Sequence, residues 1–322
     1  MKRKLVALAF SDHHAAAWKQ HNKDGRRTAL SCKLLKPIFE KANRHSIPVL
    51  NCGDLIDHPK RVDNIVLHNL SQAMRSLNTQ LVGINGNHDI FRQSSYADTS
   101  PGYMNSLSYL HSHVYCVDNQ TLITETLAIH GVPYFHGDVG FIEAVEERVN
   151  TIRDDKQNIL LIHRDLAGAV EPTGEIIEKN HDQDRAMKSL FKEFDLVLSG
   201  HIHKAQKIKA LGNNVYMLGA TNQQRRSDAG TECGYWEIFD DNQVRFCPLD
   251  APQFKYHKAG EQPGDDYNYW IELPPEIKSV DEIAEETHFD VNSDRKSMVK
   301  AYLKAKGIKD KSKRKTALKY LG

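Results

Sequence analysis

The sequence of 322 residues lacks long apolar runs, paired cysteines and an excess of either charge. No run approaches the roughly 20 apolar residues that a membrane-spanning helix needs, so we expect no membrane segment. The short apolar stretch near the start, residues 5–10, meets polar residues without a cleavage site for a signal peptide. We therefore interpret this stretch as the first strand of a folded domain.

The five cysteines are scattered along the chain, and none has CxxC spacing. This pattern argues against a disulfide framework and against a zinc finger. Unpaired cysteines are typical of a reducing compartment, so we expect a cytoplasmic protein.

The charges nearly cancel over the whole chain, with 43 basic and 42 acidic residues, but they are unevenly distributed. Ten basic residues and one acidic residue lie between Lys296 and Lys319, which leaves 33 basic and 41 acidic residues elsewhere, a net charge of −8. An acidic body therefore carries a basic tail. Such a tail is either a solvated helix or a surface that binds phosphates or a partner.

Short apolar runs alternate with amphipathic stretches, which is typical of an α/β fold. We predict strands at residues 5–10, 47–51, 81–84, 158–162 and 196–198, and helices at 28–43 and 62–77. The length suffices for one sizeable domain with a smaller appendage, and the composition changes near residue 252.

Side chains that bind metals follow five of the predicted strands. Ligands in open α/β sheets gather at the carboxyl ends of strands, so these distant segments are expected to meet in one crevice. In chain order the five motifs are Asp12-His13-His14, Gly53-Asp54-Leu55-Ile56-Asp57, Gly86-Asn87-His88-Asp89, His163 and Gly200-His201-Ile202-His203.

Carboxylate, amide and imidazole ligands without cysteine suit manganese or iron better than structural zinc. Two such cations about 4 Å apart can hold both the attacking and the leaving oxygen of a phosphoryl displacement. Each motif alone is weak evidence for a metal site, and an isolated histidine such as His163 more often has a structural role. The five motifs in order, each after a strand, together predict a two-metal site.

These motifs resemble the signature of the calcineurin-like metallophosphoesterases, D-x-H, G-D-x-x-D, G-N-H-D, H and G-H-x-H. Within that superfamily they most resemble the SbcD branch, nuclease subunits that act with an SbcC-like coiled-coil ATPase on DNA double-strand breaks. The features that favour this branch are Ser11-Asp12-His13-His14, a single fourth-motif histidine followed by Arg164, and Gly200-His201-Ile202-His203-Lys204-Ala205-Gln206. The resemblance covers about residues 5–240.

The resemblance implies an α/β fold in which a two-sheet β-sandwich is flanked by helices. A nuclease domain would span residues 1–250, a small α+β cap residues 251–290, and a basic C-terminal helical segment residues 291–322. The implied function is a manganese-dependent DNA exonuclease and endonuclease in recombination, repair or degradation. The compact length is similar to that of phage or bacterial members, which would place it in a bacterial cell or a phage-infected host.

The resemblance also implies seven ligands for two divalent ions, with Mn²⁺ as the expected metal. They are Asp12, His14 and His203 for the first ion, Asn87, His163 and His201 for the second, and Asp54 as the bridge. His88 would protonate the leaving group or stabilise the transition state, and Asp57 would support the ligands without binding metal.

Two further sets of residues have open interpretations. Lys23, Arg26 and Arg27 follow the first motif and would either neutralise DNA phosphates or form a solvated loop. The tail has an apolar stripe at helical spacing that would dock on its own domain or, as in the SbcD branch, on the ATPase. This stripe consists of Met298, Val299, Tyr302 and Leu303.

The resemblance further implies a homodimer formed through helices near residues 62–77. The chain departs from the branch where relatives often have Tyr-x-Gly-Ser-Pro, since it has Tyr216-Met217-Leu218-Gly219-Ala220. That departure puts the local DNA contacts in doubt. Two alternatives remain: a small-molecule or protein phosphoesterase with the same site, and a non-catalytic scaffold that binds DNA ends.

Overall fold

In the computed structural model the chain forms two units. The first consists of Met1–Lys255 and Asp265–Trp270, and the second of Tyr256–Gly264 and Ile271–Gly322. Most of the expected cap and all of the expected C-terminal segment lie outside the described residues, so those boundaries stay predictions. The structure describes residues 3–20, 25–58, 62–90, 101–178, 181–257 and 268–272.

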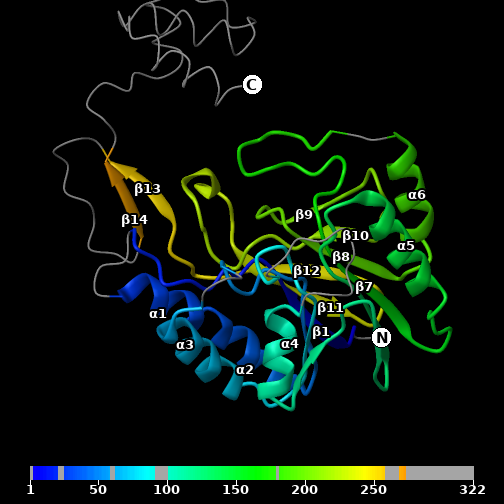
Figure 1. Cartoon of the computed structure of the whole chain (residues 1–322), viewed down its shortest axis with the longest axis horizontal. Coiled ribbons are helices and arrows are strands. Elements are labelled where there is room, and N and C mark those ends of the chain that lie inside the picture. Colours follow the sequence, from blue (N-terminus) through cyan, green and yellow to red (C-terminus); the bar gives the residue numbers. More distant parts are fainter. Residues whose placement is uncertain are drawn as a thin grey trace, which may run out of the picture. The chain divides into compact units, whose positions relative to one another are not determined.

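The first unit contains two sheets of six strands (Figure 1). The first sheet has the order β12 (Val244–Pro248), β11 (Gly234–Phe239), β1 (Leu5–Phe10), β2 (Val49–Asn51), β3 (Leu81–Gly83), β4 (Val114–Cys116). The second has the order β5 (Thr121–Ile123), β6 (Leu127–Val132), β7 (Gln157–His163), β8 (Leu196–Gly200), β10 (Val215–Met217), β9 (Gln206–Lys207). A separate pair consists of β13 (Phe254–His257) and β14 (Tyr269–Glu272).

Strand direction brings the motifs together. Strands β1 to β4 run parallel to one another, and so do β6, β7, β8 and β10. The carboxyl ends of β1, β2 and β3 therefore lie at one edge of their sheet, and those of β7 and β8 lie at one edge of theirs. The predicted α/β sandwich is confirmed.

The two sheets enclose an apolar core, and β1 shows how the sequence specifies it. Ala7 and Ala9 pack between the sheets with Leu161 of β7 and Leu198 of β8. Leu8, on the opposite face of the strand, packs under the helices. Because both faces are buried, the strand is a continuous apolar run without alternating polar residues.

Helices cover the outer face of each sheet (Figure 1). The first sheet carries α1 (Arg26–Lys33), α2 (Leu35–His45), α3 (Asn64–Arg75) and α4 (Tyr103–Leu110), and the second carries α5 (Asp138–Val149) and α6 (His181–Phe191). The single helix predicted at 28–43 is two helices that meet at Leu34. Pro37 has no N–H to donate, so it is better placed in the first turn of a new helix than inside a longer one. None of the helices in the described ranges is long and apolar enough to cross a membrane.

Candidate metal centre

The loops after β1 and β2 run side by side and hold three predicted ligands close together. The N–H of Asp12 donates to the Gly53 carbonyl at 3.1 Å, and the N–H of His14 donates to the Asp54 carbonyl at 2.9 Å. Asp12, His14 and Asp54 have φ values of 50°, 46° and 53°, and His201 has 90°. Side-chain-bearing residues rarely adopt this left-handed region, and such strain concentrates at functional sites.

The loop after β3 approaches Asp54 through a glycine. A Cβ on Gly86 would lie 2.2 Å from Asp54 Oδ1, so only glycine fits at this position. The approach lets the backbone N–H of His88 donate to the same Oδ1 at 2.8 Å. One oxygen of Asp54 is thereby fixed, and the other points towards the histidines.

Two groups of side chains meet around Asp54. In the first, His14 Nε2 lies 3.3 Å from His203 Nε2 and 3.9 Å from Asp12 Oδ1. Asp12 is held in turn by the backbone N–H of His201, which donates to both of its carboxylate oxygens at 3.0 and 3.1 Å.

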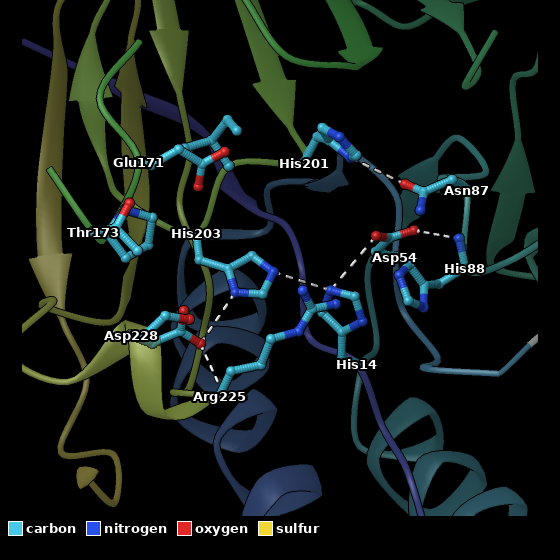
Figure 2. A pocket seen from close by; sticks show the side chains of 13 residues that line it. His14, Asp54, Asn87, His88, Glu171, Thr173, His201, His203, Arg225 and Asp228 are labelled. Atoms are coloured by element: carbon cyan, nitrogen blue, oxygen red, sulfur yellow. Dashed lines mark hydrogen bonds and ion pairs between the residues drawn. The ribbon is translucent and has the colours of Figure 1, made fainter. Parts of the chain in front are cut away.

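The second group lies on the other side of Asp54. Asn87 Oδ1 is 3.0 Å from His163 Nε2 and 3.0 Å from His201 Nδ1. Asp54 Oδ2 joins the two groups, because it is 3.3 Å from His163 Nε2 and 3.5 Å from His14 Nε2. The seven predicted ligands thus form two clusters that share one carboxylate. Figure 2 shows those that line the pocket, namely His14, Asp54, Asn87, His201 and His203.

The outward nitrogens of two of the imidazoles are held by oxygen acceptors. His163 Nδ1 donates to the Cys52 carbonyl at 2.6 Å, so its Nε2 lone pair points into the second cluster. His203 Nδ1 donates to Asp228 Oδ2 at 3.2 Å, which directs its Nε2 into the first. Metal-binding histidines characteristically use their second nitrogen in this way.

These atoms fit a metal centre. At metal–nitrogen distances of about 2.1 Å, two ligands of one ion lie roughly 3.0–3.4 Å apart. The second cluster has this spacing around Asn87, at 3.0 Å, and so does the pair of His14 and His203 in the first, at 3.3 Å, while His14 and Asp12 lie farther apart, at 3.9 Å. The facing Nε2 atoms of His14 and His203 lie 3.3 Å apart, which suits two imidazole ligands of one cation. Oxygen and nitrogen donors without sulfur fit manganese or iron.

The charges of the metal-free site reflect the same arrangement. Burial lowers the pKa of His163, but the Asp54 carboxylate 3.3 Å away outweighs it and raises the pKa to about 9. Burial and the neighbouring His163 lower the pKa of His201 to about 3. Burial raises the pKa of Asp54, but His163 and His14 outweigh it and hold it well below its usual range.

His88 and Asp57, the predicted catalytic pair, lie beside the first cluster. His88 Nδ1 donates to the backbone carbonyl of Asp57 at 2.6 Å, and the Asp57 carboxylate lies 3.3 Å from His14 Nδ1. Asp57 thus contacts both histidines. Its carboxylate also forms a third potential metal-binding group with His14 and His88.

A pocket of about 230 Å³ opens over the clusters (Figure 2). Its walls include residues that the sequence motifs did not indicate, namely Glu171, Thr173, Arg225, Ser227 and Asp228. They come from the loops that follow β7 and β10 and have no motif of their own. For the loop after β10, the only indication in the sequence was the departure from the family pattern after Tyr216. The sequence contained no indication of Glu171 and Thr173.

The predicted DNA-binding residues occupy different environments. Arg26 is exposed, whereas Arg27 is 3% exposed and donates to the carbonyls of Gln20 and Gln224. The Arg27 guanidinium also lies 3.9 Å from the centre of the Trp18 ring. Its charge therefore faces the protein interior. Lys23 and the tail residues Met298, Val299, Tyr302 and Leu303 lie outside the described residues.

Comparison with known proteins agrees with the motifs. The family model described as calcineurin-like phosphoesterase matches residues 5–205, which include all the predicted metal ligands. A solved structure of a hypothetical protein from Thermus thermophilus is similar over 67% of this chain and 75% of its own, at 13% identity and a TM-score of 0.36.

Proposed function

Because this chain belongs to the calcineurin-like phosphoesterase family, we propose that it is a manganese-dependent DNA nuclease of the SbcD type. Members of this family are phosphoester hydrolases. The observation that carries the proposal is the position of Asp54, whose Oδ2 lies within 3.5 Å of imidazoles from both clusters. A carboxylate shared in this way is what a pair of metal ions needs to remain close together.

Asp12, His14, His203 and Asp54 would hold one cation, and Asp54, Asn87, His163 and His201 would hold the other. When bound, two divalent cations would act as Lewis acids on the phosphoryl oxygens and would lower the pKa of water.

The protein's own contribution to proton transfer would come from His88. Its Nδ1–H donates to the Asp57 carbonyl, so Nε2 is the ring atom that can exchange a proton with the substrate. His88 lines the pocket and is 26% exposed, which suits a residue that meets the leaving oxygen.

The choice of DNA as substrate is supported by the branch-specific residues around the first and last motifs, Ser11 to His14 and Gly200 to Gln206. The test is manganese-dependent digestion of end-labelled duplex DNA, with bis(4-nitrophenyl) phosphate as a second substrate. Digestion of both supports the nuclease. Cleavage of the aryl diester alone would instead favour a small-molecule phosphodiesterase, and cleavage of neither would favour the non-catalytic scaffold.

The partners belong to the same proposal: an SbcC-like coiled-coil ATPase and a second copy of the chain. Ile65 and Leu67 of α3, 52% and 38% exposed, support a contact between copies through this helix. Deleting residues 296–322 should preserve cleavage of a short oligonucleotide but abolish co-purification with the ATPase. Weaker DNA binding by the truncated protein without any ATPase would show instead that the tail grips DNA.

A further inference from the structure

Arg225 stands in the wall of the metal pocket and has no role in the predicted metal site. It lies in the loop that follows β10, on the same wall as Ser227 and Asp228, and Figure 2 shows its side chain extending from this loop into the pocket. The side chain is exposed, and among the described residues no carboxylate lies within ion-pair distance of its guanidinium.

The backbone of Arg225 is tied to the metal ligands. Its N–H donates to Asp228 Oδ2 at 3.0 Å, and the same oxygen accepts from His203 Nδ1 at 3.2 Å and from the N–H of Gln224 at 2.8 Å. The position of Arg225 relative to His203 is therefore fixed by a shared acceptor, while its side chain makes no such bond.

The described lining of the pocket contains several carboxylates and a single arginine. Asp54, Asp228 and Glu171 all line it, and Arg225 is the one lysine or arginine among the described residues of its lining. A guanidinium offers several donors in a planar fork that matches the oxygens of a phosphate. Because this guanidinium is exposed and no carboxylate of the described residues pairs with it, its donors remain available to an anionic ligand.

We propose that Arg225 is a substrate-binding residue, whose guanidinium donates to the non-bridging oxygens of the substrate's phosphate in this pocket. This inference rests on the proposed function, since it takes a phosphodiester as the substrate. It assigns to this loop a contact that the family motifs do not include.

Arg225→Ala tests the assignment, with Arg226→Ala as the matched control. Arg226 is the exposed neighbour and does not line the pocket. The manganese-loaded proteins would be titrated with inorganic phosphate by calorimetry, and KM and kcat would be measured with bis(4-nitrophenyl) phosphate. For Arg225→Ala we expect roughly ten- to hundredfold weaker phosphate binding and a similar rise in KM. Arg226→Ala should match the wild type, and Arg225→Lys should fall between.

Manganese affinity distinguishes substrate binding from support of the loop. The backbone N–H that bonds to Asp228 remains in Arg225→Ala, so manganese binding should be unchanged. Unchanged phosphate affinity and KM, or a loss of manganese binding, would overturn the assignment. Phosphate binding does not require DNA, so a wild-type protein that fails to cut DNA would sink the nuclease proposal and still allow this test.

Discussion

His14 and His203 face each other through their Nε2 atoms, which lie 3.3 Å apart although the residues are 189 positions apart in sequence. Each ring has its other nitrogen near a carboxylate, Asp57 at 3.3 Å from His14 and Asp228 at 3.2 Å from His203. When each ring carries its proton on the nitrogen nearer the carboxylate, both Nε2 lone pairs point to the same place. A cation held there would bind both rings, and the predictions on manganese below follow from that arrangement.

Asp54→Asn should abolish manganese binding at both sites and not at one alone. The carboxylate lies within 3.5 Å of His14 and His163, and an amide is a much weaker bridge between two cations. Calorimetric titration with manganese would count the sites, and Asp154→Asn, at an exposed position far along the chain, is the control. Two tight sites in Asp54→Asn would contradict the bridging role.

Asp228→Asn should weaken manganese binding by roughly 10- to 100-fold while the protein stays folded. The Asp228 carboxylate accepts from His203 Nδ1 and from the backbone N–H groups of Gln224 and Arg225. Neutralising it loosens the ring orientation and lowers the basicity of Nε2. The effect should concern the first site, so calorimetry should still detect a second site close to wild-type affinity. Equal weakening of both sites would show that the loop, and not His203, was disturbed.

His88→Gln should lower kcat by roughly 10²–10⁴-fold with metal and DNA binding near wild type. His88 reaches Asp54 only through its backbone N–H, which the substitution keeps. Single-turnover cleavage of an oligonucleotide, with manganese affinity measured in parallel, separates the two effects. A fully active variant, or one that no longer binds manganese, would show that His88 has another role.

The sequence was sufficient for the parts of the site that come from strand ends. Three parallel strands of one sheet and two of the other end at the site, so Asp12, Asp54 and His163 could be brought together from periodicity and motif order alone. Asp228 and Arg225 could not, because they come from an irregular loop whose path depends on tertiary hydrogen bonds.

Local periodicity also failed to predict structure where one residue determines the local backbone or its burial. The apolar spacing over 28–43 continues through Leu34, but the backbone starts a second helix there, with Pro37 in its first turn. Arg27 is a similar case. From the sequence, a basic residue in a loop is expected to be exposed. Arg27 is buried because its guanidinium packs on the Trp18 ring and donates to two backbone carbonyls.

Metal binding should release protons at neutral pH, because nearby carboxylates outweigh burial and raise the pKa values of His163 and His203, and both rings must be unprotonated at Nε2 to become ligands. In the metal-free protein the pKa of His163 is raised to about 9, while His201, with a pKa lowered to about 3, is already neutral. Manganese affinity should therefore rise with pH up to about 9 and level off above it. Calorimetry in buffers of different ionisation enthalpy measures the released protons. An affinity independent of pH between 7 and 9 would contradict this description of His163.

Arg27→Ala should lower the free energy of unfolding by about 2–4 kcal/mol, whereas Arg26→Ala should change it little. Arg27 is 3% exposed, its guanidinium lies 3.9 Å and 4.4 Å from the ring centres of Trp18 and Tyr269, and it donates to the Gln224 carbonyl at 2.9 Å. Truncation leaves the buried carbonyl of Gln224 without this donor and opens a gap beside two aromatic rings. Urea denaturation followed by tryptophan fluorescence gives the free energy of unfolding of both variants.

The salt dependence of DNA binding, measured well below the unfolding transition, tests whether Arg27 contacts a DNA phosphate instead. If Arg27 bound a phosphate, its loss would flatten the slope of log K against log salt by roughly 0.9 without a loss of stability. Since the guanidinium faces the interior, we expect the opposite pair of results, and Arg26 is the position where a change of slope would reveal a phosphate contact.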